Sequence, residues 1–266
     1  MDGLVPGDPE RIGEFWLAGR LGAGGQGVVY EGYGPDGGRV AIKVLHGASE
    51  APQDLEQMAA EARAAQRVAS FCTARILQVH LKPPRPYIVS EYIDGLSLQS
   101  TVAGGGGRAP RRFGEDDLHR LGIGIVTALT AIHQAKVVHR DLKPGNVMLG
   151  PDGPRLIDFG IARVLDTHSA TQGGGLVGTL RYMAPEVYAG QRAGAEADVF
   201  AWGAIMVFAA TGSHAFTGGD LPAIAHQVRT CDPDLGALPE PLRALVAAAL
   251  DKDPLSARRR GRSWRR

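Results

Sequence analysis

Four polar residues near the middle of the chain have the types and the order that phosphoryl transfer requires. Segment 139–146 reads HRDLKPGN, and Asp158 follows it. Asp141 can accept the proton of a substrate hydroxyl and align it for attack, while Lys143 can offset charge on a γ-phosphoryl group. Asn146 and Asp158 supply the hard oxygen ligands that Mg²⁺ prefers. Solvated turn acids are a poor alternative, because an ordinary turn does not need every polar position of such a set filled.

Two further segments extend this set in a fixed order. Asp158 opens the tripeptide DFG at 158–160, and the tripeptide APE stands at 184–186. Chance rarely produces all three segments in one chain in this order. His139 follows the apolar pair Val137-Val138, which we expect to end a strand, so we predict a packed scaffold role for it. No histidine stands at metal-ligand spacing from acids or cysteines, which favours a carboxylate and amide metal site.

A glycine-rich segment, GAGGQGVV at 22–29, matches the pattern G-x-G-x-x-G. Alone this match is weak, because it also occurs in dinucleotide-binding folds and in ordinary glycine turns. A dinucleotide site needs a helix directly after the glycines, whereas Val28, Val29 and Tyr30 continue as a strand. The sequence therefore predicts a hairpin tip whose backbone can lie close over phosphates.

Lys43 ends the apolar strand segment Ala41-Ile42-Lys43. A lone strand lysine is usually just part of a solvated face. The functional interpretation is that its ammonium meets the α- and β-phosphates of a nucleotide and is held there by a carboxylate. Glu61, from the amphipathic segment 52–68, is the best placed candidate for that carboxylate, and Glu56 is the alternative.

The elements that must position these residues fall into two groups. Strands are predicted first, and one helix interrupts them, with Leu55, Met58, Ala62 and Ala65 at helical spacing. Helices dominate after the glycine run at 104–107, beginning at an acidic turn at 115–117. This order favours an α+β protein in two segregated lobes. The predicted strands are 15–21, 28–33, 40–45, 76–79 and 87–92, and the later helices are 118–132, 197–211, 221–230 and 239–250.

Composition narrows the class of protein. The 266 residues are 44% hydrophobic and carry a formal charge of +1, which favours one large domain or two joined lobes and gives no indication of nucleic acid as a partner. Cys72 and Cys231 are too few for a disulfide framework, so we expect a reducing compartment, the cytoplasm by default. Residues 1–14 lack a secretory core, and the apolar stretch 199–210 is shorter than a membrane-spanning helix.

The segments VHRDLKPGN at 138–146 and YMAPE at 182–186 resemble the protein kinase family, in particular its bacterial serine/threonine branch. The resemblance runs from about Gly13 to about Pro254. It implies a bilobal fold, ATP with Mg²⁺ between the lobes, and protein serine or threonine as acceptor, because Lys143 stands two residues after Asp141. The corresponding division is an extension at 1–12, a kinase domain at 13–258 with lobes at about 13–91 and 94–258, and a basic tail at 259–266.

The same resemblance implies roles around the adenine. Backbone groups of Glu91 and Ile93 form a hinge that binds it, and Ser90 holds the gatekeeper position. Because that serine is small, we expect an accessible back pocket. The implied nucleotide contacts comprise the hairpin residues Leu21, Gly22, Ala23, Gly24, Gly25, Gln26 and Gly27, the residues Val29, Ala41 and Met148 that sandwich the ring, and Lys43.

Regulation is implied by Arg140, since a phosphate on the loop between 158 and 186 can pair with this arginine. Thr171 is the first choice for the phosphorylated residue, although Ser and Thr are common in any loop. Thr179 is expected to contact Asp141 and Lys143. Autophosphorylation between two copies would require the chain to associate with itself, and its other expected partners are protein substrates carrying serine or threonine.

The sequence departs from the family pattern near its end. Leu180 stands where a proline is frequent, and the arginine that should pair with Glu186 is displaced by one residue to Arg258. A buried glutamate without a partner costs stability, so either the lower lobe is marginal or the chain is part of a longer protein. Two rival functions remain: a pseudokinase scaffold, which the intact set around Asp141 disfavours, and a small-molecule phosphotransferase, which should lack the APE segment.

Overall fold

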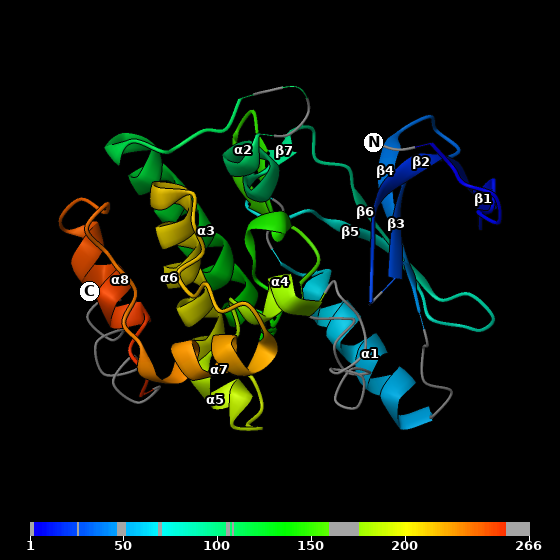
Figure 1. The fold of residues 1–266 in the computed structure, drawn as a ribbon. Coiled ribbons are helices and arrows are strands. Elements are labelled where there is room, and N and C mark those ends of the chain that lie inside the picture. Colours follow the sequence, from blue (N-terminus) through cyan, green and yellow to red (C-terminus); the bar gives the residue numbers. More distant parts are fainter. Residues whose placement is uncertain are drawn as a thin grey trace.

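The structure, a computed structural model, describes residues 3–25, 27–46, 52–68, 71–104, 107, 109–159 and 176–253. Figure 1 shows a strand-rich small lobe beside a larger helical lobe, with helix α1 (Pro52–Ala65) at the base of the sheet. The predicted α+β class and the two-lobed arrangement are therefore confirmed. In the described part of the chain, no helix combines the length and the apolar character that a membrane crossing would require.

The small lobe is built on an antiparallel sheet of six strands in the order β1-β2-β3-β4-β6-β5. Alternation of buried and exposed residues sets its inner face, as in β2, where Phe15 and Leu17 are buried and Trp16 is exposed. The predicted turn between β3 and β4 closes with a hydrogen bond from the Gly34 amide to the Gly38 carbonyl. The strands are β1 (Arg11–Ile12), β2 (Phe15–Gly24), β3 (Gly27–Tyr33), β4 (Arg39–Leu45), β5 (Ile76–His80) and β6 (Tyr87–Glu91).

The end of the N-terminal segment, just before the boundary expected after residue 12, contributes a strand to the sheet of this lobe. Arg11 and Ile12 form strand β1 and pair with β2. The Ile12 side chain is 3% exposed and belongs to the core beneath the sheet. Asp8, farther toward the N-terminus, is fastened by polar contacts that the sequence pattern did not reveal.

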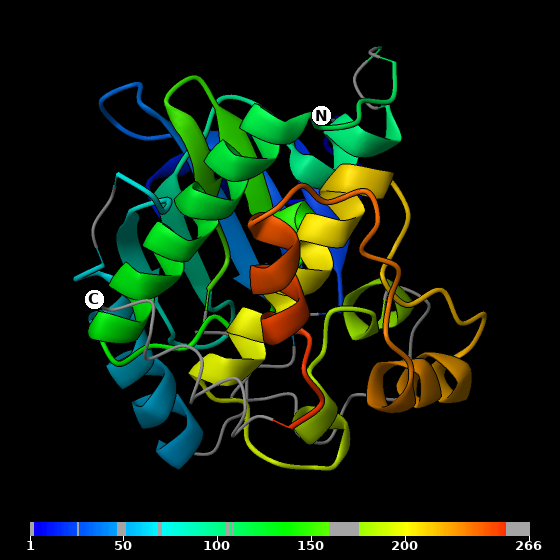
Figure 2. The same ribbon diagram turned by 90° about the vertical axis from the view of Figure 1, so that its left-hand side faces the viewer.

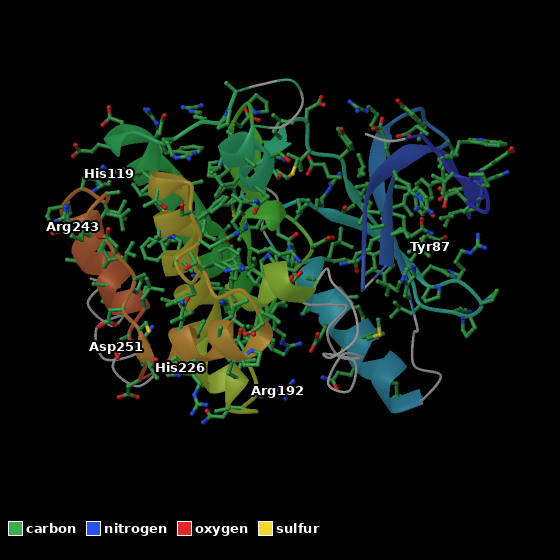
Figure 3. The ribbon with its side chains drawn as sticks, viewed as in Figure 1. Tyr87, His119, Arg192, His226, Arg243 and Asp251 are labelled. Carbon is green, nitrogen blue, oxygen red and sulfur yellow. The ribbon has the colours of Figure 1, made fainter. Side chains whose placement is uncertain are left out.

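Helix α1 joins the small lobe to the large one through its buried face. Met58, Ala62 and Ala65 recur at helical spacing and are almost completely buried, as predicted. They lie in the same apolar cluster as residues of the large lobe, whereas the face of the sheet under β1 to β4 has its own smaller cluster. Figure 3 places Tyr87 among the side chains of the small lobe and His226 and Arg243 in the helical lobe.

Helix α6 (Ala195–Thr211) is the centre of the large lobe. Twelve of its residues are buried, so the helix is enclosed rather than amphipathic. It packs against α3 (Glu115–Gln134) and α8 (Leu242–Ala249), which Figure 2 shows side by side with it. The predictions of α3, α6 and α7 (Leu221–Thr230) are confirmed, and α8 begins three residues later than predicted. Shorter helices are α2 (Leu98–Ala103), α4 (Leu176–Leu180) and α5 (Pro185–Tyr188).

A second small sheet holds the segment where the motif residues gather. Strands β7 (Leu96–Ser97), β8 (Val147–Gly150) and β9 (Gly153–Leu156) pair in that order, and the 3₁₀ turn η1 (Pro144–Asn146) precedes β8. The sequence did not predict these strands, and Val137-Val138 is not the strand end that we expected. Leu156 hydrogen-bonds through its backbone to Cys72 and Ala74, which ties β9 to the small lobe just before Asp158.

Candidate active site

Asp141 lies in the loop between α3 and β8 at the centre of a small polar network. Its side chain is 7% exposed, and its Oδ2 accepts hydrogen bonds from Lys143 Nζ at 2.9 Å and from Asn146 Nδ2 at 3.2 Å. Asn146 Nδ2 also donates to the Asp141 carbonyl at 2.7 Å. These contacts fix one carboxylate oxygen, so the other is the atom with which Asp141 can meet a hydroxyl donor.

Thr179 reaches the same network from a distant part of the sequence. Lys143 Nζ donates to Thr179 Oγ1 at 3.0 Å while it also contacts Asp141. The predicted meeting of Thr179 with Lys143 is confirmed, and Lys143 links it to Asp141. Helix α4 thus brings a hydroxyl beside the ammonium of Lys143.

The oxygen atoms expected to hold Mg²⁺ fit that ion by their chemistry. Because Asn146 Nδ2 donates to Asp141, the amide oxygen of Asn146 is directed elsewhere and remains an acceptor. Asp158 follows β9 with φ 58°, a left-handed conformation that is strained for a non-glycine residue. Lys43 Nζ lies 3.4 Å from Asp158 Oδ2, which brings the strand lysine to the expected metal ligand.

The partner of Glu61 differs from the one expected. We expected the Glu61 carboxylate to hold Lys43, but both of its oxygens accept hydrogen bonds from Arg140 Nη1, at 2.9 and 3.0 Å. Lys43 is recorded beside Asp158. From the sequence, either Lys43 or Arg140 could pair with Glu61. The position of α1 in the folded protein determines which of the two cations Glu61 binds. Glu56, the alternative, is exposed on α1.

Asp198 is a positioning residue that the sequence analysis missed. It lies near the start of α6, 1% exposed, and its carboxylate accepts hydrogen bonds from the backbone amides of His139 and Arg140 at 2.8 and 2.9 Å. His133 Nε2 lies 2.7 Å from its Oδ2. Arg140 has φ 63°, so Asp198 holds the loop in a strained conformation one residue before Asp141. An acid within the otherwise apolar stretch 197–210 was the available signal.

His139 has the packed position predicted for it. The residue is fully buried, and neither ring nitrogen has a hydrogen-bond partner among the described residues. Its ring lies 6.2 Å from that of Phe159, in a tilted arrangement. Burial lowers the pKa of His139, since an imidazolium would be poorly solvated there. His139 is therefore a neutral, packed side chain that helps to hold the backbone of the loop before Asp141 in place.

The glycine-rich segment forms the hairpin tip that the sequence predicted. Strands β2 and β3 pair up to Gly24 and Gly27, and residues 21–25 are exposed. Gly27 has φ 149°, and a Cβ there would lie 1.9 Å from the Val44 carbonyl oxygen, so only glycine fits. Gln26 lies outside the described residues. The tip therefore has the exposed, close-approaching backbone that a phosphate cover requires.

The residues expected around adenine lie along β3, β4, β6 and β8. Ala41 is the register partner of Ser90, and Val40 is that of Glu91. Val29 belongs to β3 and Met148 to β8, and Ile93 is 8% exposed just after β6. A cavity of about 40 Å³ is lined by Lys43, Ala74, Ile76, Ile88, Ser90, Asp158 and Phe159. It lies beside Ser90, where the small side chain was expected to leave a back pocket.

The protein kinase domain family matches residues 15–257. The chain belongs to this family. Named relatives of the kinase domain include the probable serine/threonine-protein kinase PkwA of Thermomonospora curvata, 41% identical over 254 residues, and the serine/threonine-protein kinase AfsK of Streptomyces coelicolor, 37% identical over 257 residues. The chain is covered to 94% and 95% in these matches but spans only 33% and 31% of the two relatives. PknA of Mycobacterium tuberculosis is 34% identical over 259 residues, which are 94% of the chain and 59% of the relative.

The lower lobe of the kinase domain leaves two expectations outside the described residues. Glu186 is partly buried, which raises the pKa of its carboxyl, and no cation pairs with it within residues 176–253 or the other described segments. Arg258, its expected partner, and Thr171, the expected phosphorylation site, both lie outside those segments, as do the basic residues 259–266. Leu180, at the usual proline position, is 5% exposed and ends α4.

Proposed function

We propose that this kinase domain transfers the γ-phosphoryl group of ATP to serine or threonine hydroxyls of protein substrates. The single observation that carries the proposal is the contact of Lys143 with both Asp141 and Thr179. Three residues from two distant segments meet there in the arrangement that aligning a hydroxyl for attack needs. The named relatives are serine/threonine kinases, which supports the same acceptor.

Asp141 prepares the acceptor in this proposal. Its free carboxylate oxygen accepts the hydrogen bond of the incoming hydroxyl and takes up its proton as the new bond to phosphorus forms. Lys143 lies 2.9 Å from the other oxygen and places positive charge where the transferred group gains negative charge. Asn146 holds the Asp141 side chain in place through two hydrogen bonds.

Lys43, Asp158 and Asn146 form the nucleotide end of the site. Asn146 and Asp158 would hold Mg²⁺, which neutralises charge on the phosphates when bound. Lys43 provides the cation for the α- and β-phosphates, and the backbone of residues 22–25 and Gly27 covers them. Hinge groups at Glu91 and Ile93, with Val29, Ala41 and Met148 on the two faces, would bind adenine. Leu21, at the mouth of the hairpin, is exposed and can close over the base.

The contact between Glu61 and Arg140 supports a regulatory state. Arg140 is the group expected to receive a phosphate on the loop, and in the structure it holds Glu61. A phosphorylated Thr171 would compete for the arginine and release Glu61 to reach Lys43. Incubation with ATP, followed by mass spectrometry to locate the phosphate and by a peptide-phosphorylation rate, on the wild type and Thr171→Ala, tests this. Loss of activation without Thr171 is the expected result, and full activation of the variant rejects the site.

A pseudokinase that binds nucleotide without transfer is the second candidate. Only the displaced arginine near the C-terminus favours it, and the contacts of Asp141 with Lys143 and Asn146 weigh against it. One assay separates the two functions: purified protein is incubated with labelled ATP and Mg²⁺, beside Asp141→Asn. Label on protein serine or threonine supports the kinase, whereas nucleotide binding without any transfer by the folded wild type supports the pseudokinase.

A further inference from the structure

A polar cluster outside the active site fastens the N-terminal segment to the glycine hairpin. The Asp8 side chain is 3% exposed, although its segment was expected to be a mere extension. Asp8 Oδ1 lies 2.6 Å from Arg20 Nη2 and 2.7 Å from the Tyr30 hydroxyl, and Oδ2 accepts from Arg20 Nε at 2.8 Å. The amide of Val5 donates to Oδ2 at 2.9 Å. One carboxylate thus receives four hydrogen bonds from three parts of the chain.

The two side chains that Asp8 holds are cross-strand neighbours. Arg20 on β2 and Tyr30 on β3 are register partners in the antiparallel pair. The next pair toward the tip is Gly22 with Val29, and the register shifts between Arg20 and Gly22. Asp8 therefore joins both strands at the last regular pair before an irregularity, which is the point about which the tip can tilt.

On the β2 side, the described residues of the tip have no packed side chains, whereas Gly27 and Val28 on the β3 side pair with β4. Residues 21–25 are exposed, whereas Tyr30 at the base of the hairpin is 4% exposed. A glycine-rich segment without packed side chains takes its direction from the strands that carry it. The N-terminal segment is itself anchored, because the Leu17 amide donates to the Glu10 carbonyl and Ile12 is part of the core. Asp8 is thus a fixed point rather than a mobile arm.

We propose that Asp8 is a positioning residue for nucleotide binding, which sets the angle of the hairpin tip by clamping Arg20 and Tyr30 together. The proposal rests on the proposed function, since the ligand of the tip is the phosphate chain of a nucleoside triphosphate. Asp8 does not touch the nucleotide. It acts by keeping β2 and β3 in one relative orientation, so that the backbone of the tip meets the phosphates without first being ordered.

The charge of Asp8 suits this role. Its hydrogen bonds to Arg20 hold the pKa of the carboxyl far below the ordinary value, so it is ionised over the whole physiological range. Hydrogen bonds between ionised partners are shorter and stronger than neutral ones. Asparagine at this position keeps the size of the side chain but loses the charge and one acceptor, which makes Asp8→Asn the informative change.

The chain offers a closely matched control on the same strand. Tyr30→Phe removes the hydroxyl that donates to Asp8, and Tyr33→Phe removes a hydroxyl that donates to Glu31 at 3.3 Å. Both variants lose one oxygen atom from β3, but only the first touches the clamp. Affinity for a fluorescent ADP analogue with Mg²⁺ is measured directly by titration, and KM for ATP and kcat are measured with a peptide, all well below the melting temperature of each variant.

Asp8→Asn and Tyr30→Phe should each weaken nucleotide binding and raise KM for ATP by about three- to tenfold, with kcat and the peptide KM changed less than about twofold. Tyr33→Phe should match the wild type. Unchanged nucleotide affinity in Asp8→Asn overturns the proposal, and so does an equal loss in Tyr33→Phe, which would indicate general weakening of the sheet. The binding titration needs no phosphoryl transfer, so a failure of the clamp is distinguishable from a failure of the proposed function.

Discussion

Glu61 and Arg140 form an ion pair that joins helix α1 to the loop of Asp141. The two carboxylate oxygens lie 2.9 and 3.0 Å from the same guanidinium nitrogen, and both side chains are largely buried. Glu61 therefore binds the arginine that precedes Asp141, and Lys43 lies beside Asp158. The ion pair therefore links three features: the position of α1, the group that Arg140 binds and the carboxylate that lies beside Lys43.

Replacement of Glu61 by glutamine should lower kcat/KM at least about tenfold, because a neutral amide holds neither Arg140 nor Lys43 as a carboxylate does. Glu56→Gln is the matched control, since Glu56 is exposed on the same helix and should remain within about twofold of the wild type. Steady-state kinetics with ATP and a peptide check both variants. Equal losses in the two would show that the charge of α1 matters and that the particular pair does not.

Asp198→Ala should destabilise the protein by about 2–5 kcal/mol, because the change leaves two buried amides and His133 without their acceptor. Activity should also fall, since Arg140 loses the contact that holds its left-handed conformation. Urea unfolding gives the stability, and a peptide assay below the transition gives the activity. Asp220→Ala, which removes a surface helix cap on α7, provides a comparison and should cost about 1 kcal/mol.

Ser90→Met should fill the cavity of about 40 Å³ beside Lys43 and Phe159. Inhibitors whose bulky groups extend past Ser90 from the adenine position should lose affinity about tenfold or more, because the methionine side chain occupies the same space. ATP does not extend there, so its KM should change little. Inhibitor titrations on both proteins check the prediction. An unchanged affinity for the bulky compounds would mean that the small serine does not control access to this cavity.

Acid should destabilise the fold through His139. Burial lowers its pKa in the folded protein below its ordinary value of 6.5, so the unfolded chain binds the proton more readily. Its contribution to stability is complete above pH 6.5 and falls as the pH drops from there toward the folded pKa, by at most about 1.4 kcal/mol per pH unit. The negative charges of Asp198, Asp141 and Asp158 raise the pKa of His139, so they oppose burial and reduce the loss of stability in acid.

Unfolding free energies measured between pH 5 and 8 should show this slope in the wild type and a smaller one in His139→Phe. Part of the slope remains in that variant, because burial also lowers the pKa of His214. His119→Phe is a control at a partly buried position on α3. An equal slope in His139→Phe and in the wild type would show that His139 does not cause the pH dependence of stability.

The sequence predicted those site residues whose positions are determined by their neighbours in the chain. It did not predict those whose contacts depend on the packing of distant elements. The segment at 139–146 and the hairpin at 22–29 fix their own geometry within a few residues, so the sequence indicated that Asp141 and Lys143 lie together and that the glycines form a tip, while their roles stay predictions. The partners of Glu61 and the role of Asp198 depend on how helices 52–65 and 195–211 pack, which periodicity does not specify. Asp8 was missed for the same reason: its three partners lie on two strands and a turn, and no local pattern marks them.

The fold shows the same division. Long amphipathic or strongly apolar helices and the alternating strands were predicted to within a few residues. Strands β7, β8 and β9 have two to four residues each, too few for a period to be recognised, and they pair with one another in a sheet of their own. Tertiary context, not propensity, determines such short elements.

We propose that Asp141 is the catalytic base of a protein serine/threonine kinase, and a comparison of the wild type with Asp141→Asn provides the test. Wild type and Asp141→Asn are incubated with labelled ATP, Mg²⁺ and a protein substrate, and ATP affinity is measured separately. The wild type should place label on serine or threonine, and kcat of Asp141→Asn should be lower by about two to four orders of magnitude with nearly unchanged ATP affinity. A folded wild type that transfers no label, or an Asp141→Asn protein that transfers it as fast, would contradict the account.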